Sequence, residues 1–110
     1  MICKFNIVIL IFIVFLSACQ DEKRKEVVIL IENHHFKPEE IILRPHEKVY
    51  LIVKNLDATA EEFESFELKR ERLIPAHSEA RVPIGPLVPG IYKFFGEFHE
   101  KTAKGQIRVE

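Results

Sequence analysis

The stretch Gly90-Ile91-Tyr92-Lys93-Phe94-Phe95-Gly96-Glu97-Phe98-His99-Glu100-Lys101-Thr102-Ala103-Lys104-Gly105-Gln106-Ile107-Arg108-Val109 decides the fold. It reads as an aromatic strand, a loop in which one histidine stands among acids, and a closing strand. Polar and apolar residues alternate strictly over 106–109, which predicts a strand with one solvated face. The histidine of the loop, His99, is the first candidate for a functional residue.

The same kind of pattern runs through the rest of the chain. Short apolar or alternating runs predict strands at 27–31, 41–43, 49–53, 79–84 and 91–95. Turn signals rich in proline, glycine, asparagine and aspartate separate them. Short strands at this spacing predict an all-β fold, a Greek-key antiparallel β-sandwich of about seven to eight strands. Only the segment 58–67 is expected to form a short helix or a structured loop.

The N-terminus has the features of an export signal. Lys4 precedes an apolar run over 7–16 that ends in Leu16-Ser17-Ala18-Cys19. A run of about ten residues suits a signal peptide, whereas a helix that spans a bilayer needs about twenty. Small residues followed by a cysteine are typical of a bacterial lipoprotein signal, and the alternative is an ordinary secretory signal with a chance cysteine.

This interpretation divides the chain into three parts. We expect a signal peptide at 1–18, a lipidated Cys19 with a charged tether over 19–26, and one domain over 27–110. Acylation at several positions of the cysteine gives stable anchoring, because a single chain binds membranes only marginally. The predicted location is the periplasmic or extracytoplasmic face of a bacterial membrane, with the membrane itself as a partner.

The cysteine count excludes thiolate chemistry. Cys3 and Cys19 are the only cysteines in the chain. The first would be removed with the signal and the second would carry lipid, so the mature domain has neither a free thiol nor an internal disulfide. This excludes a blue-copper thiolate, a CxxC redox pair and a cysteine nucleophile. The formal net charge of −1 gives no support for a nucleic-acid partner.

Three motifs in 27–110 resemble those of a cupredoxin domain. The stretch Phe36-Lys37-Pro38-Glu39 is similar to the F-x-P between the first strands of that family. Asn55-Leu56-Asp57 is similar to the N-x-D that precedes the first metal ligand, and 85–92 resembles the turn before the aromatic strand. The resemblance implies a cupredoxin-like sandwich.

The resemblance also locates the positions of the family's copper ligands. Copper cupredoxins carry a Cys-x-x-His-x-x-Met loop between the last two strands, and these slots hold Gly96, His99 and Thr102 in this chain. The slot of the first histidine ligand holds Glu61. Three of four ligands therefore depart from the family pattern, which excludes a type 1 copper site, because that site depends on a Cu–thiolate bond.

Two shorter motifs, 61–65 and 94–99, resemble the EfeO-type cupredoxin-like proteins, which accompany iron permeases in bacterial envelopes. The resemblance brings the two acidic loops together at one end of the sandwich. Carboxylates with one imidazole suit iron, manganese or Cu(II) rather than Cu(I). The predicted metal ligands are the four residues Glu61, Glu64, Glu97 and His99. Secondary candidates are Glu62, Glu100, His77 and His35.

The local pattern limits which of these acids can converge. If 61–64 is extended, Glu62 and Glu64 point to one side, and the adjacent Glu61 and Glu62 cannot both point inward. Runs of acids on loops are most often solvated surface. The spacing therefore leaves open which of the candidates meet at one ion.

Together these features predict a lipid-anchored metal-binding protein of the envelope. It would be an accessory of iron uptake with a bound iron or copper ion, a carboxylate and histidine site in place of blue copper, and an iron permease as partner. Two alternatives stay open, a non-catalytic interaction module without metal and a Cu(II) carrier. The chain has no motif of a hydrolytic enzyme, and ferroxidase chemistry would lack a type 1 copper as electron acceptor.

Overall fold

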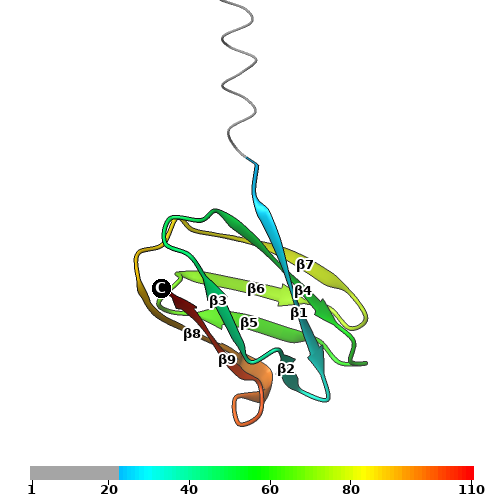
Figure 1. Ribbon diagram of the computed structural model, residues 1–110. Coiled ribbons are helices and arrows are strands. Elements are labelled where there is room, and N and C mark those ends of the chain that lie inside the picture. Colours follow the sequence, from blue (N-terminus) through cyan, green and yellow to red (C-terminus); the bar gives the residue numbers. More distant parts are fainter. Residues whose placement is uncertain (1–22) are drawn as a thin grey trace, which may run out of the picture.

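A computed structural model describes residues 23–110. These residues form a sandwich of two β-sheets (Figure 1). The predicted signal peptide and Cys19 lie outside the described residues. The elements are β1 (Lys25–Glu32), β2 (His35–Lys37), β3 (Glu40–Leu43), β4 (Val49–Asn55), β5 (Glu61–Ser65), β6 (Arg70–Ile74), β7 (Glu79–Ile84), β8 (Gly90–Gly96), the short 3₁₀ helix η2 (Glu97–His99) and β9 (Lys104–Val109).

The strands divide into a four-stranded sheet, in the order β2-β1-β4-β7, and a five-stranded sheet, in the order β3-β9-β8-β5-β6. The predicted all-β sandwich is confirmed, with nine strands in the described part of the chain rather than seven to eight. The sheets are mixed rather than purely antiparallel, because β1 pairs with β4 and β3 pairs with β9 in parallel. The chain passes to the opposite sheet between β2 and β4, so β4 returns beside β1 in the same direction.

Three phenylalanines from the two sheets pack together in the core. Phe36, Phe63 and Phe94 are almost fully buried and come from β2, β5 and β8. The ring of Phe94 lies 5.0 Å from that of Phe36 and 5.2 Å from that of Phe63. Such aromatic pairs add about 0.5–1.5 kcal/mol each beyond the area they bury. The cluster joins the two sheets and fixes the strands from which η2 and its loop extend.

The segment predicted as a short helix or structured loop at 58–67 contains strand β5, so that prediction is wrong. Two of the three inward positions of β5 are polar, Glu61 and Ser65, which hides the alternation typical of a strand. Each finds a partner distant in the sequence; Ser65 Oγ donates to the backbone oxygen of Lys93 at 2.6 Å. Strand β6 also escapes prediction, because it is an exposed edge strand.

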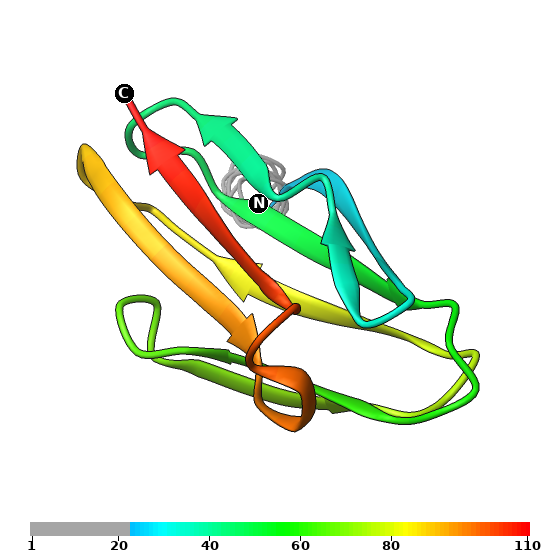
Figure 2. The same ribbon diagram turned by 90° about the horizontal axis from the view of Figure 1, so that it is seen from below.

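The two ends of the sandwich differ in their contents. The chain enters at Lys25, whose backbone N–H donates to the backbone oxygen of Lys48 at one end. Strand β1 then runs to the opposite end, where the β1–β2 turn, the loop after β4 and helix η2 gather (Figures 1 and 2). We call this opposite end the loop end. All the buried hydrophobic residues of the described chain lie between Ile29 and Val109, so a soluble form that begins at Gln20 keeps this entire core.

No helix in the part of the chain that the structure describes has the length and apolar character needed to cross a membrane.

Candidate functional site

The buried carboxylate of Glu61 pairs with the partly exposed ring of His99 at the loop end. Glu61 is 1% exposed, and its Oε2 lies 2.6 Å from Nδ1 of His99. Its Oε1 accepts the backbone N–H groups of Glu62 at 3.0 Å and Phe98 at 2.9 Å. A buried carboxylate is tolerated only when hydrogen bonds replace its hydration. Here three nitrogen atoms bind the two carboxylate oxygens of Glu61, and the contact with His99 links β5 to η2.

Gly96 provides the space for this carboxylate. It ends β8 and pairs with Phe63 of β5, the strand that carries Glu61. A Cβ at position 96 would lie 2.6 Å from Cδ of Glu61 and 2.7 Å from Cβ of Ala103. Atoms this close cannot coexist without a shift of the backbone or of the Glu61 side chain. The carboxylate therefore occupies the volume that a larger side chain at position 96 would need.

A second histidine lies on the first. The ring of His34, in the β1–β2 turn, stacks on that of His99 with centroids 3.6 Å apart and planes 14° from parallel. Asp57 holds this turn: its carboxylate accepts the backbone N–H groups of Asn33 at 2.8 Å and His34 at 3.0 Å. The Nδ1 atom of His34 lies 3.5 Å from Oδ2 of Asp57.

The surroundings of Asp57 favour its charged form. Burial acts to raise the pKa of this carboxyl group, but the backbone donors of His34 and Asn33 and the nearby His34 and His99 outweigh burial. The pKa of Asp57 consequently lies below its usual value. Each of the two stacked histidines is thus associated with its own carboxylate, His99 with Glu61 and His34 with Asp57.

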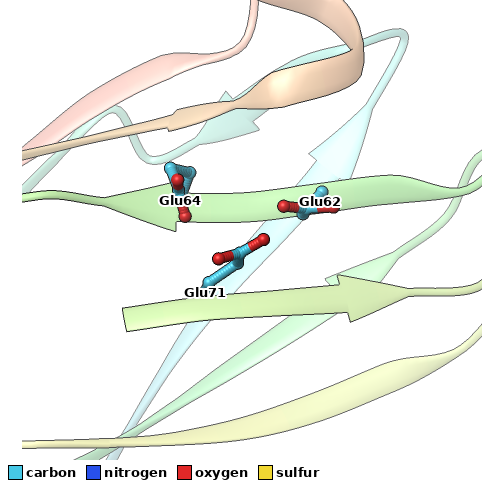
Figure 3. Close-up of side chains that lie close together, drawn as sticks. All are labelled: Glu62, Glu64 and Glu71. Atoms are coloured by element: carbon cyan, nitrogen blue, oxygen red, sulfur yellow. The ribbon is translucent and has the colours of Figure 1, made fainter. Parts of the chain in front are cut away.

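A separate group of acids lies on the outer face of the five-stranded sheet. Oxygen atoms of Glu62, Glu64 and Glu71 lie within 4.8 Å of one another, and we call these three residues the acidic cluster. Figure 3 shows Glu71 on β6 reaching toward the two glutamates of β5. Glu64 and Glu71 are cross-strand partners in the β5–β6 hairpin. Within residues 23–110, the buried Oε1 atom of Glu62 has no hydrogen-bond partner.

The acidic cluster resists full ionisation. The carboxyl groups of Glu71 and Glu97, with which Glu62 can share a proton, together with burial and their negative charges, raise the pKa of Glu62 to about 8. Burial and the charges of Glu71 and Glu97 also raise the pKa of Glu64. A cation among these oxygens would remove the repulsion and would give the unpaired oxygen of Glu62 a partner.

The structure divides the predicted ligand set between two places. Glu61 and His99 meet inside the loop end, whereas Glu62 and Glu64 point outward from β5 into the acidic cluster, as strand alternation requires. The charge of Glu97 acts on this cluster.

The remaining candidates are exposed and lie outside both groups. They are His35 on β2, His77 in the loop after β6, and Glu100 after η2. Three participants are absent from the predicted set, His34, Asp57 and Glu71. Asp57 had a signal, because it stands in the N-x-D motif. No sequence motif indicated Glu71, since its position in the acidic cluster depends on the register of the β5–β6 hairpin.

Comparison with known proteins agrees with the fold. Residues 6–109 match the model of a family described as a cupredoxin-like domain. An uncharacterized protein of Rickettsia prowazekii, RP394, is 43% identical over 84 residues, which cover 76% of this chain and 67% of the relative.

Solved structures with a similar fold include proteins whose titles name copper. Auracyanin A, a blue copper protein from Chloroflexus aurantiacus, has a TM-score of 0.69 at 12% identity and covers 80% of this chain and all of its own. The metal-binding domain of the Cu(I)-exporting ATPase CopA from Streptococcus pneumoniae has a TM-score of 0.66 at 18% identity, covering 77% of this chain and 84% of its own. Amicyanin from Paracoccus versutus has a TM-score of 0.60 at 20% identity, covering 83% and 87%. These identities establish the fold alone.

The residues of this chain do not fit a type 1 copper ion. That site requires a cysteine thiolate, and Gly96 stands in the slot that the resemblance gives to cysteine. Thr102, in the methionine slot, is exposed. The carboxylate of Glu61 fills the space beside Gly96, and its oxygens are already bonded to two backbone donors and to His99. The interior position is thus closed by the protein's own side chain.

Proposed function

This chain belongs to the cupredoxin-like domain family, and from that premise we propose that it is a metal-binding protein of the bacterial envelope that holds a hard cation, iron first, in the acidic cluster. Cupredoxin-like folds are associated with metal binding and copper. In this chain the carboxylate of Glu61 closes the interior position, so we place the ion on the outer face of β5 and β6. The iron-uptake role, the lipid anchor and a permease partner belong to this proposal.

The observation that carries the proposal is the convergence of Glu62, Glu64 and Glu71. Iron, manganese, magnesium and calcium ions prefer carboxylate oxygens. With metal–oxygen bonds of about 2.0–2.6 Å, oxygens on opposite sides of one ion lie about 4–5 Å apart. The oxygens of the acidic cluster meet that limit, with a mutual separation within 4.8 Å. The unpartnered oxygen of Glu62 is a ligand atom without a competing donor among residues 23–110.

The arrangement of the ends supports a role at a membrane surface. A lipid at Cys19 would join the domain through β1, at the end where Lys25 meets Lys48. Because the β1–β2 turn lies at the opposite end of the sandwich from the start of β1 (Figure 1), the loop end would then be the end farther from the anchor. An ion held near that end stays accessible to a second protein, which is what transfer to a permease requires. The EfeO-type motifs at 61–65 and 94–99 are the reason for placing iron first.

The test is metal titration of the soluble form that begins at Gln20. Fe(II) without oxygen, Fe(III), Mn(II) and Cu(II) would be compared by calorimetry and metal analysis of the wild type and Glu71→Gln. Glu40→Gln is a matched control, because Glu40 lies on the same sheet but pairs with Arg108 at 3.1 Å. We expect iron binding that Glu71→Gln abolishes and Glu40→Gln preserves.

Two results would overturn the assignment. If Glu71→Gln and the wild type bind iron with equal affinity, the ion is not held in the acidic cluster. No binding of any cation would instead favour the alternative of an interaction module, in which the sandwich carries loops for a partner protein and no metal.

A further inference from the structure

Charges of opposite sign gather at the two ends of the sandwich. The end where β1 begins, which we call the anchor end, also contains the end of β7, the start of β8 and the connection from β3 to β4. This end carries the basic residues Lys23, Arg24, Lys25, Arg44 and Lys48, all exposed except the half-buried Arg24. The loop end instead carries the exposed acids Glu79, Glu97 and Glu100 besides Asp57 and Glu61. The formal net charge of −1 for the whole chain therefore conceals an uneven distribution.

Most of the basic residues of the anchor end have no acidic partner. The acids at this end each lie beside a basic residue, in the pairs Glu47–Lys25 at 3.7 Å, Glu26–Arg81 at 2.7 Å and Glu110–Arg108 at 3.6 Å. In the part of the chain that the structure describes, the other four basic residues of this end form no ion pair. The anchor end therefore keeps an excess of positive charge, which exceeds the two acids that precede it, Asp21 and Glu22.

Arg24 holds the start of the described chain against the domain. Its Nη1 atom donates to the backbone oxygen of Ile84 at 2.9 Å and lies 3.4 Å from that of Val49. Its guanidinium group also lies 5.5 Å from the centre of the Tyr50 ring. Val49 and Ile84 are cross-strand partners where β4 and β7 meet at the anchor end. Only residues 20–22 therefore separate Cys19 from the part of the chain that the domain holds.

With a lipid at Cys19, this short link would keep the anchor end close to the bilayer. An extended chain spans at most about 3.3–3.6 Å per residue, so the four steps from Cys19 to Lys23 reach no farther than about 13–14 Å. Electrostatic interactions are screened over about 8 Å at physiological ionic strength. Even a fully extended link thus leaves the basic residues within about two screening lengths of the lipidated residue, and every shorter conformation brings them nearer.

We propose that the anchor end is a docking surface for anionic phospholipid headgroups, which bind Lys23, Arg44 and Lys48. This inference rests on the proposed lipid anchor and extends membrane contact from the tether to a surface of the folded domain. Basic residues near an anionic bilayer add electrostatic attraction to the hydrophobic anchoring of a lipid. Val88, in the connection from β7 to β8 at the same end, is 61% exposed and adds an apolar contact.

The distribution of charge also orients the domain. An anionic bilayer attracts the anchor end and repels the acids of the loop end, so both interactions favour the same orientation. The loop end then faces away from the bilayer, and a second protein can reach it. A tether alone would leave the orientation of the domain undefined.

The experiment measures binding of the soluble form that begins at Gln20 to phospholipid vesicles, by cosedimentation at low ionic strength. Vesicles of phosphatidylcholine are compared with vesicles of equal parts phosphatidylcholine and phosphatidylglycerol, which is anionic. The informative variant combines Lys23→Glu with Lys48→Glu at the anchor end. Its matched control combines Lys101→Glu with Lys104→Glu, because these exposed lysines follow η2 at the loop end and give the same change in net charge. Circular dichroism verifies that each variant is folded.

We expect the wild type to bind the anionic vesicles in preference to the neutral ones, and added salt to release it. The variant at the anchor end should lower the partition coefficient at least tenfold, whereas the control should change it less than threefold. An equal loss in both variants would overturn the proposal, because net charge alone would then govern binding. No preference of the wild type for anionic vesicles would overturn it as well. The soluble form carries no lipid and the assay contains no iron, so neither failure would bear on acylation of Cys19 or on the acidic cluster.

Discussion

Replacing His99 by alanine should destabilise the domain by about 3 kcal/mol, because the buried carboxylate of Glu61 loses its only side-chain partner among residues 23–110. Breaking a buried ion pair by removing one partner costs about 3–5 kcal/mol. Here the backbone N–H groups of Glu62 and Phe98 still bind Oε1 of Glu61, which places the expected cost at the lower end. For a domain of this size, about 3 kcal/mol corresponds to a fall in Tm of about 12–24 °C.

The Glu61→Gln variant separates the buried charge from the shape of the site. Glutamine fits the space beside Gly96 and its oxygen can accept the same two N–H groups, while its amide can donate to Nδ1 of a neutral His99. The net worth of an ordinary hydrogen bond is about 1 kcal/mol, so the loss should be of that order. Glutamine carries no charge that would be left buried and unpaired. His99→Ala should therefore lower the free energy of unfolding much less in the Glu61→Gln background than in the wild type, which gives a coupling energy of about 2 kcal/mol.

Urea denaturation of the four proteins, followed by circular dichroism at neutral pH, measures this coupling. His77→Ala serves as the control, because His77 is exposed and should change stability by less than about 0.5 kcal/mol. If the effects of the two substitutions simply add, the carboxylate and the imidazole do not depend on each other. The view of the pair as a link between β5 and η2 would then be refuted.

Gly96, Glu62 and Asp57 each provide a further test of the same geometry. Gly96→Ala should lower stability by about 1–3 kcal/mol through overpacking against Glu61, measured in the same urea assay; unchanged stability would contradict the close contact. The pKa of Glu62 rises from 4.5 to about 8 on folding, so the folded state binds more protons between these values and metal-free stability should fall as pH rises from 4.5 to 8. Glu62→Gln should weaken this dependence of stability on pH. An unaltered dependence would mean that another group causes it. The pKa of Asp57 lies below 3.8 in the folded state, so the stability that its charged form contributes is present above pH 3.8 and is lost as pH falls. Asp57→Asn should therefore lower stability by about 1–3 kcal/mol at pH 7 and by less below pH 3.8. An equal loss at both pH values would exclude this role.

The sequence predicts the strands whose inward residues are apolar. Strand β7 reproduces the predicted range, and β4 and β9 extend the predicted runs by a few residues. Strand β5 was not predictable in this way, since two of its inward side chains are Glu61 and Ser65. Their partners, His99 and the backbone oxygen of Lys93, lie 38 and 28 positions away. A hydrophobic pattern records apolar burial, but it carries no information about a buried polar group satisfied from a distant strand.

The candidate site was predictable to a similar extent. The resemblance to cupredoxins brought together the slots of Glu61, Gly96 and His99, and the structure places these three in contact. It could not indicate that Glu61 turns inward while its neighbour Glu62 turns outward, because that depends on the strand at 61–65. His34 and Glu71 enter their groups only through tertiary contacts, a turn stacked on η2 and a cross-strand register.

The closed interior position has a consequence for how the protein handles ions. In a copper cupredoxin a bound ion joins the loop that follows the aromatic strand to the first ligand. In this chain the Glu61–His99 pair makes the same connection between η2 and β5. We infer that the scaffold does not need an ion to hold its loop end together. An ion held in the acidic cluster, as proposed above, could therefore bind and leave without unfolding the domain.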